Sequence, residues 1–206
     1  MTTPVDSRDM TALARTAREE MPPETQFRAE DEAVIAAHGE FLLGLEHDLV
    51  QGFYETVYAH PNTAGVFADG ERPARERTLS EWWRRTVEGP KDDDYFAWMA
   101  MVGLVHVVRG VSNPMMIAMS QYLDRGVEDA AVGALPAEEA QRLTGAVRRL
   151  TATISAVVIH SYDLAIEHAL YEVAGMPPAL LHRLRDQEVS TSLQHARDAL
   201  GRQRFE

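Results

Sequence analysis

One histidine in an apolar, helix-length segment is the first residue of this chain that could do chemistry. The segment spans residues 95–110 and reads YFAWMAMVGLVHVVRG, with His106 inside it. Because side chains three, four and seven residues apart share a face of a helix, one face would carry Met99, Val102, Gly103, His106 and Gly110. We interpret this face as an apolar surface with two gaps at the glycines and a single imidazole, which suits a flat, apolar metal macrocycle held by one nitrogen. The alternative is a core histidine with a hydrogen bond, beside glycines that serve close helix packing.

A tyrosine about fifty residues upstream is the second candidate. Residues 49–61 read LVQGFYETVYAHP. The apolar stripe of this helical pattern includes Val50, Phe53 and Val57, so the ring of Tyr54 is expected to point inward. A buried phenol needs a hydrogen-bond partner. From the spacing alone, the expected partner is a backbone or side-chain carbonyl.

Other catalytic and metal-binding patterns do not occur in the sequence. Cysteine is absent, which excludes disulfides, thiolate metal sites and covalent attachment of haem. The zinc-protease pattern HExxH, the di-iron pattern ExxH, a glycine-rich phosphate loop and the GxSxG of hydrolases are also missing. His160, Asp163 and Glu167 could share a helix face, which we interpret as exposed polar surface.

The composition and charge indicate a globular protein that does not bind nucleic acid. The 206 residues are 45% hydrophobic and 25% charged, and the formal net charge is -12. Such an acidic chain lacks the basic surface that phosphate contacts need. No run of about 18 apolar residues predicts a membrane span, and the N-terminus lacks the apolar core of a signal peptide. We therefore expect a cytoplasmic protein without a nucleic-acid or membrane partner.

The elements that must position the two candidates are helices. Apolar residues recur at helical spacing throughout the chain, and no convincing strand pattern occurs. Proline and glycine mark the expected helix ends. The expected helices cover residues 11–21, 28–58 with a break at Gly39 or Gly44, 73–88, 95–110, 113–127 and 137–173, with an amphipathic piece beyond 178. The fold class is therefore all-α, with a substantial core.

The residues above combine into a longer pattern that resembles a known family. Phe53-Tyr54 and His60-Pro61 are followed by a tryptophan-bearing helix, Tyr95, the run VGLVHVVRG at 102–110, and Asn113-Pro114. This order is similar to the sensor globins, which comprise the haem domains of globin-coupled sensors and the single-domain protoglobins. The resemblance covers about residues 28–170. It implies a globin fold with an extra N-terminal helix and a C-terminal helical extension, divided as 1–27, 28–174 and 175–206.

The resemblance also implies a cofactor and a site. The cofactor would be haem b, with His106 as the iron ligand and Tyr54 as the donor of a hydrogen bond to bound oxygen. Apolar groups on the tyrosine side would be Phe53, Leu79 and Trp82, and those on the histidine side would be Met99 and Val102. The cation that meets the haem propionates is left open among Arg84, Arg85 and Arg109.

The function implied is the binding of a diatomic gas such as O2, CO or NO. No stretch long enough for an output domain follows residue 173, so we expect a stand-alone gas-binding globin, more a gas binder or sensor than an enzyme. Turnover of NO with bound oxygen would require an external reductase. A haem-free globin-fold interaction module is the alternative from another class. The resemblance further implies a homodimer through the helices at 113–127 and 137–173, and a sensor would need a signalling partner protein.

Overall fold

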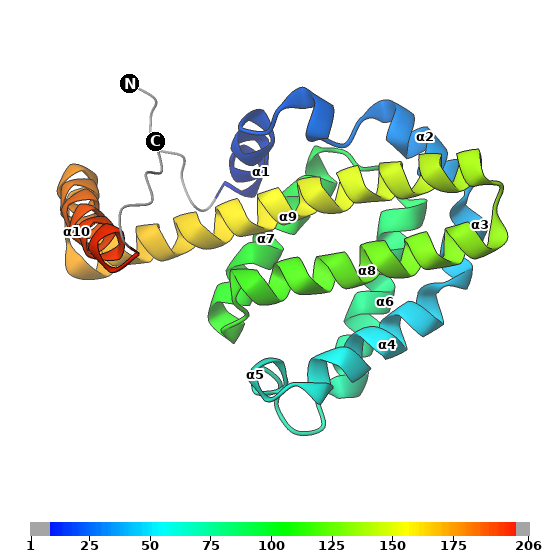
Figure 1. The fold of residues 1–206 in the computed structure, drawn as a ribbon, viewed down its shortest axis with the longest axis horizontal. Helices are drawn as coiled ribbons and strands as arrows, with labels where there is room; N and C mark the ends of the chain where they lie inside the picture. The colour runs from blue at the N-terminus through cyan, green and yellow to red at the C-terminus, as the bar shows by residue number, and fades with distance from the viewer. Residues whose placement is uncertain (1–8, 201–206) are drawn as a thin grey trace. The chain divides into compact units, whose positions relative to one another are not determined.

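The computed structural model describes residues 9–200, and the regular elements in this range are helical (Figure 1). The α-helices are α1 (Met10–Glu19), α2 (Ala29–Ala37), α3 (Gly39–Gly44), α4 (Glu46–Ala59), α5 (Pro61–Ala64), α6 (Arg72–Glu88), α7 (Asp93–Arg109), α8 (Asn113–Ala134), α9 (Ala137–Ala174) and α10 (Pro178–Ala199). The expected all-α class is confirmed. Residues 1–8 and 201–206, the outer ends of the predicted N-terminal extension and C-terminal tail, lie outside the described range. Within that range, no helix has both the length and the apolar character needed to cross a membrane.

The chain forms two compact units, and the division falls inside α9. The first unit ends at Leu164 and the second begins at Ala165. The second unit holds the end of α9 and α10, which are joined by a left-handed turn at Gly175 (φ 59°). There the Glu167 carboxylate accepts a hydrogen bond from the Tyr171 hydroxyl at 2.7 Å and lies 2.7 Å from the His182 imidazole. The predicted domain boundaries stay predictions.

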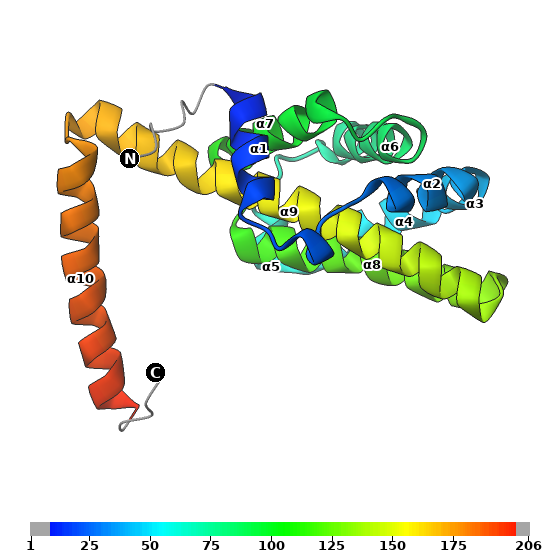
Figure 2. The ribbon, with the colours of Figure 1, turned by 90° about the horizontal axis from the view of Figure 1, so that it is seen from above.

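The first unit is built on helices that pack in pairs. In both views α8 and α9 run side by side (Figures 1 and 2). Helix α1 packs on α7, where the Arg18 guanidinium lies 4.7 Å from the centre of the Phe96 ring. Helix α2 is tied to α9 by the buried Asp31 carboxylate, which accepts two hydrogen bonds from Arg149. Helix α4 packs on α6 and on α8.

Two predicted segments differ from the observed helices. The single pattern over 28–58 is divided into three helices by breaks at His38 and Leu45. The helix expected over 113–127 continues to Ala134, because no proline follows Pro114 before Pro136. Helix α9 begins and ends within a residue of its prediction.

Helix α7 is defined at both ends by local sequence. The Asp92 carboxylate caps its N-terminus by accepting a hydrogen bond from the Tyr95 backbone N–H at 2.9 Å. Asp93 and Asp94 lie in the first turn, where acidic side chains interact favourably with the positive end of the helix dipole. Its C-terminus ends at Gly110, which adopts the left-handed conformation at φ 71°. Such a conformation carries little steric penalty only for glycine.

The interpretation that glycines leave room for a macrocycle on α7 is wrong. Gly103 faces α9, where a Cβ atom would lie 2.2 Å from the Ser161 Oγ and 2.5 Å from the Val158 carbonyl oxygen. Gly110 forms the end of the helix. The alternative reading of close helix packing therefore holds for Gly103, and its absent side chain lets α7 approach α9 more closely than any other residue type would.

We expect Gly103→Ala to destabilise the protein, because the added methyl group overlaps the backbone of α9. Overpacking of this kind costs about 1–3 kcal/mol, and in a protein of this size each kcal/mol lowers the melting temperature by roughly 2–4 °C. Gly133→Ala is the matched control, since Gly133 lies in α8 with nothing within 4 Å of its added Cβ. Thermal unfolding followed by circular dichroism measures both. Equal melting temperatures for the two variants would contradict the contact.

Candidate functional site

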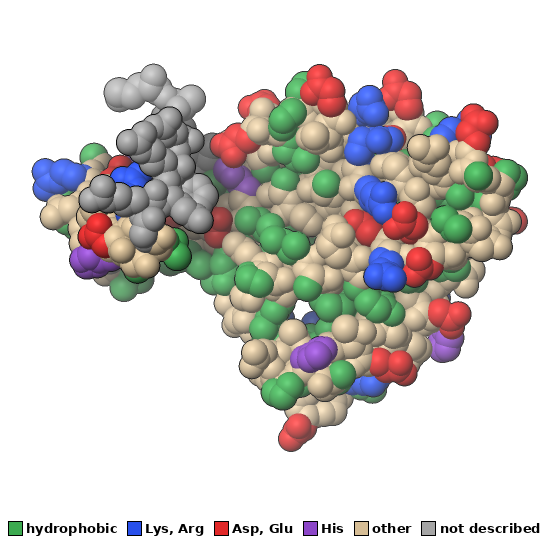
Figure 3. Space-filling view, in the orientation of Figure 1, with side chains coloured by type: hydrophobic (Ala, Val, Ile, Leu, Met, Phe, Trp, Pro, Cys, Tyr) green, Lys and Arg blue, Asp and Glu red, His purple; other side chains and the backbone are tan. Residues whose placement is uncertain are grey.

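A cavity of about 400 Å³ lies between α4, α6, α7, α8 and α9 in the first unit. Its volume is within the range of small-molecule sites, and its walls are mostly apolar. Figure 3 shows a hollow in the surface with hydrophobic side chains at its edge. The seven residues that the sequence analysis assigned to one site all line this cavity: Phe53, Tyr54, Leu79, Trp82, Met99, Val102 and His106.

His106 contributes one nitrogen to the cavity. It lies near the end of α7, and its Nδ1 edge contacts the Met116 side chain of α8. Among the described residues, Nε2 has no hydrogen-bond partner. This nitrogen is therefore available to a ligand.

The charge state of His106 suits the role of a ligand atom. Burial lowers the pKa of the imidazole below its ordinary value of 6.5, and the neighbouring Arg109 guanidinium lowers it further. Both effects disfavour the protonated ring. At neutral pH the imidazole is uncharged, which is the form in which histidine binds a metal. No group of three or more His, Asp or Glu side chains between residues 9 and 200 is placed to hold a metal ion.

Tyr54 is buried in α4, and its hydroxyl donates a hydrogen bond to the Arg75 carbonyl oxygen of α6 at 3.0 Å. A backbone carbonyl is the partner that the spacing predicted. Burial raises the pKa of the phenol to about 12, so the hydroxyl keeps its hydrogen at neutral pH. The ring packs edge-on against Phe53 and Phe67, with centroids 5.1 and 6.0 Å away. The packing fixes the ring at the cavity wall, where the hydroxyl remains a donor.

Trp82 and Met99 connect α6 to α7 across the cavity. The indole N–H of Trp82 donates to the Met99 sulfur at 3.4 Å, and Met99 itself is fully buried. The adjacent Trp83 turns into the core, where its indole N–H donates to the Leu42 carbonyl oxygen at 2.9 Å. The two tryptophans therefore do not share one environment.

Two arginines line the cavity and meet at one carboxylate. Glu71 lies just before α6, and its side chain is 2.7 Å from the Arg109 guanidinium and 3.3 Å from that of Arg75. The hydrogen bond from Arg109 lowers the pKa of this carboxyl below its usual range. Of the three arginines that the sequence analysis left open, Arg109 lines the cavity, whereas Arg84 and Arg85 do not.

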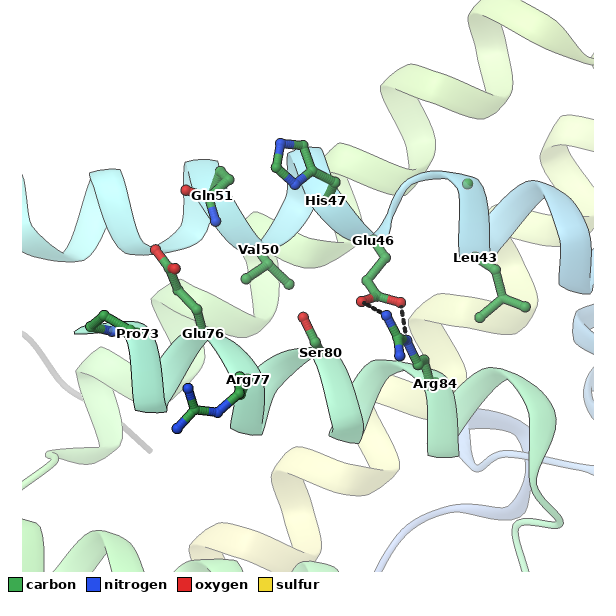
Figure 4. A pocket seen from close by; sticks show the side chains of 11 residues that line it. Leu43, Glu46, His47, Val50, Gln51, Pro73, Glu76, Arg77, Ser80 and Arg84 are labelled. Carbon is green, nitrogen blue, oxygen red and sulfur yellow. Dashed lines mark hydrogen bonds and ion pairs between the residues drawn. The ribbon is translucent and has the colours of Figure 1, made fainter. Parts of the chain in front are cut away.

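Arg84 belongs to a separate groove between α4 and α6 (Figure 4). Its guanidinium makes two hydrogen bonds to the Glu46 carboxylate, at 2.6 and 2.8 Å. This pair neutralises both charges and lowers the pKa of Glu46. His47 and Arg77 lie at the margin of the same groove. The groove is polar and open, in contrast to the apolar cavity that His106 lines.

Phe67, Arg75 and Met116 are among the wall residues that sequence reasoning did not assign to the site. Phe67 lies in the loop after α5 and Arg75 in the first turn of α6, where no periodic pattern reports which side chains point inward. The position of Met116 one turn into α8 was readable, because the helix that begins at Asn113 follows His106 after a short turn. Its contact with His106 depends on the angle between α7 and α8, which the sequence does not report.

A family model described as Protoglobin matches residues 24–167, which is well over half of the chain. A search of curated proteins finds no match.

The lowered pKa of His106 predicts a pH-dependent stability of the ligand-free protein. In the unfolded chain the His106 ring binds a proton with its ordinary pKa of 6.5, whereas in the folded chain its pKa is lower. The free energy of unfolding is therefore undiminished above pH 6.5 and falls as the pH drops below that value. His106→Gln removes the titrating group and should weaken this dependence. Urea unfolding midpoints of both proteins, on either side of pH 6.5, measure the effect. Identical pH profiles would contradict a buried, neutral His106.

Proposed function

The chain belongs to the protoglobin family, and on that premise we propose that its cavity binds haem b with His106 as the iron ligand. Membership of this family suggests haem-based binding of a diatomic gas. The finer assignment rests on the residues of this chain. The observation that carries it is the convergence of an uncharged imidazole with a free Nε2, a phenol donor and an apolar wall in one cavity.

The residues present fit a flat, apolar tetrapyrrole with two carboxylates. The apolar side chains of Phe53, Leu79 and Val102 would contact the ring faces, and the single lone pair of His106 Nε2 would hold the iron. Arg75 and Arg109 are placed to meet the carboxylates, because both line the cavity and already bind a carboxylate, that of Glu71. When bound, haem supplies an iron centre that binds O2, CO or NO.

Tyr54 is the proposed donor to the gas. Its hydroxyl carries one hydrogen, which is shared with the Arg75 carbonyl in the ligand-free structure. Donation to a gas ligand therefore requires this hydrogen to turn away from the carbonyl. The exchange favours a ligand that carries negative charge, because charge-assisted hydrogen bonds are about twice as strong as neutral ones. This argument supports selectivity for O2, which gains charge on binding to ferrous iron, over CO.

We also propose a homodimer that forms through α8 and α9. Figure 1 shows these two long helices side by side in one chain. On α8, the side chains of Ile117 and Val132 are 50% and 69% exposed. Covering such exposed apolar side chains with a second copy of the chain would contribute favourably to the free energy of association. A signalling role would also require a partner protein. Gas binding would then have to change the conformation of α8 and α9 in a way that this partner recognises.

The haem proposal predicts a spectrum that depends on His106. Protein purified with added haem should show a Soret band that shifts when the reduced protein is exposed to CO. His106→Ala should lose or alter this band, because the iron ligand is gone. His195→Ala is the control, since His195 is exposed on α10. A wild-type protein that is helical by circular dichroism but has no Soret band would contradict the proposal. A His106→Ala spectrum identical to that of the wild type would also contradict it.

The donor role of Tyr54 predicts a gas-specific effect of Tyr54→Phe. The variant loses a charge-assisted bond in the O2 complex and a neutral bond in the free protein, a difference of about 1–1.5 kcal/mol. The O2 dissociation constant should therefore rise about 5- to 12-fold, chiefly through faster dissociation, whereas that for CO should change less. Tyr58→Phe is the control, since the Tyr58 hydroxyl is buried without a partner and does not line the cavity. Equal changes for both gases in stopped-flow experiments would contradict the role.

A further inference from the structure

The carboxylate of Glu71 holds the two arginines that line the cavity. Its Oε2 atom accepts a hydrogen bond from the Arg109 Nη2 atom at 2.7 Å, and its Oε1 atom lies 3.3 Å from the Arg75 Nε atom. Glu71 is the residue before α6, but its side chain does not cap that helix. The carboxylate is therefore committed to the arginines and to the Ala68 N–H, which donates to it at 3.1 Å.

The charges at the cavity are out of balance for a ligand that brings carboxylates of its own. Of the described residues, Arg75 and Arg109 are the two arginines that line the cavity, and no aspartate or glutamate lines it. Haem b carries two carboxylates, so two guanidinium groups would balance them one to one. While Glu71 keeps both arginines, three carboxylates have to share two guanidinium groups. Carboxylates brought this close repel one another.

Glu71 satisfies the two arginines unequally. Arg109 donates a hydrogen bond to it, whereas the Arg75 Nε atom is buried and makes no hydrogen bond within residues 9–200. A buried donor without an acceptor is unfavourable. Arg75 therefore lacks an acceptor in the ligand-free protein, and a carboxylate of the ligand would supply one in a charge-assisted hydrogen bond.

We propose that Glu71 is an internal competitor of the ligand's carboxylates: it neutralises Arg75 and Arg109 in the ligand-free protein and yields them when haem binds. This role rests on the function proposed above, because it needs a ligand that carries carboxylates. Glu71 also accepts the Ala68 N–H. The exchange of partners therefore releases the loop at residues 65–71 from the two arginines.

The first test compares two ligands that differ only in their carboxylates: haem b and haem in which both carboxylates are esterified. Glu71→Gln keeps the size of the side chain but removes its charge. Its dissociation constant for haem b should fall about two- to fivefold, the range expected for an exposed ion pair, whereas that for the ester should not change. Quenching of tryptophan fluorescence measures both constants, because Trp82 and Trp98 line the cavity.

Glu76→Gln is the matched control for the loss of charge. Glu76 pairs with Arg72 at 2.6 Å on the same helix, and neither residue lines the cavity. This variant should bind haem b and the ester as the wild type does.

The second test reads the melting temperature with and without haem. Glu71→Gln should melt below the wild type in the ligand-free state, because two arginines lose their carboxylate. Saturation with haem b should reduce this difference, since the ligand's carboxylates then take the place of Glu71. A difference that stays the same in both states would overturn the proposal.

The binding data separate the remaining outcomes. Weaker or unchanged binding of haem b to Glu71→Gln would mean that Glu71 positions the arginines for the ligand, and would overturn competition. An equal change for haem b and the ester would overturn it as well, because altered packing affects both ligands alike. Failure of the wild type to bind either ligand would overturn the proposed function together with the role of Glu71, whereas the two results above leave haem binding intact.

Discussion

The close approach of α7 to α9 at Gly103 is the constraint on which the site depends. A Cβ atom at this position would overlap the Ser161 side chain and the Val158 carbonyl of α9, so the two helices can come this near only because glycine stands there. Contact at Gly103 fixes the rotation of α7 about its axis. His106 lies three residues further on and consequently faces the cavity. Helix α1 also packs on α7, where Arg18 lies over the Phe96 ring.

Two donors of the cavity wall have an acceptor inside the protein. The Tyr54 hydroxyl donates to the Arg75 carbonyl, and the Trp82 indole donates to the Met99 sulfur. An unpaired buried donor would cost about 1–3 kcal/mol, so these contacts let the cavity persist within a stable fold. One of these acceptors is a thioether, which is a weak acceptor.

Charge is gathered at one edge of the cavity. Glu71 brings Arg75 of α6 and Arg109 of α7 together, and it also accepts a hydrogen bond from the Ala68 N–H at 3.1 Å, which orders the loop that carries Phe67. The Arg109 guanidinium lies 5.8 Å from the centre of the Phe67 ring. One carboxylate thereby joins two helices and a loop. The remaining wall is apolar, which suits a ligand that is apolar over its faces and charged at one edge.

Local sequence determined where most of the helices lie, because capping and apolar periodicity are short-range properties: the apolar segment at 95–110 predicted α7. The site residues from Phe53 to His106 were those that the resemblance to the sensor globins implied. Tertiary structure decided what those residues touch. That Gly103 meets α9, that Tyr54 reaches the Arg75 carbonyl and that Met116 contacts His106 all depend on the distances and rotations between helices. These are set by side-chain packing between segments remote in sequence, and a periodic pattern carries no record of which partner a helix face will meet.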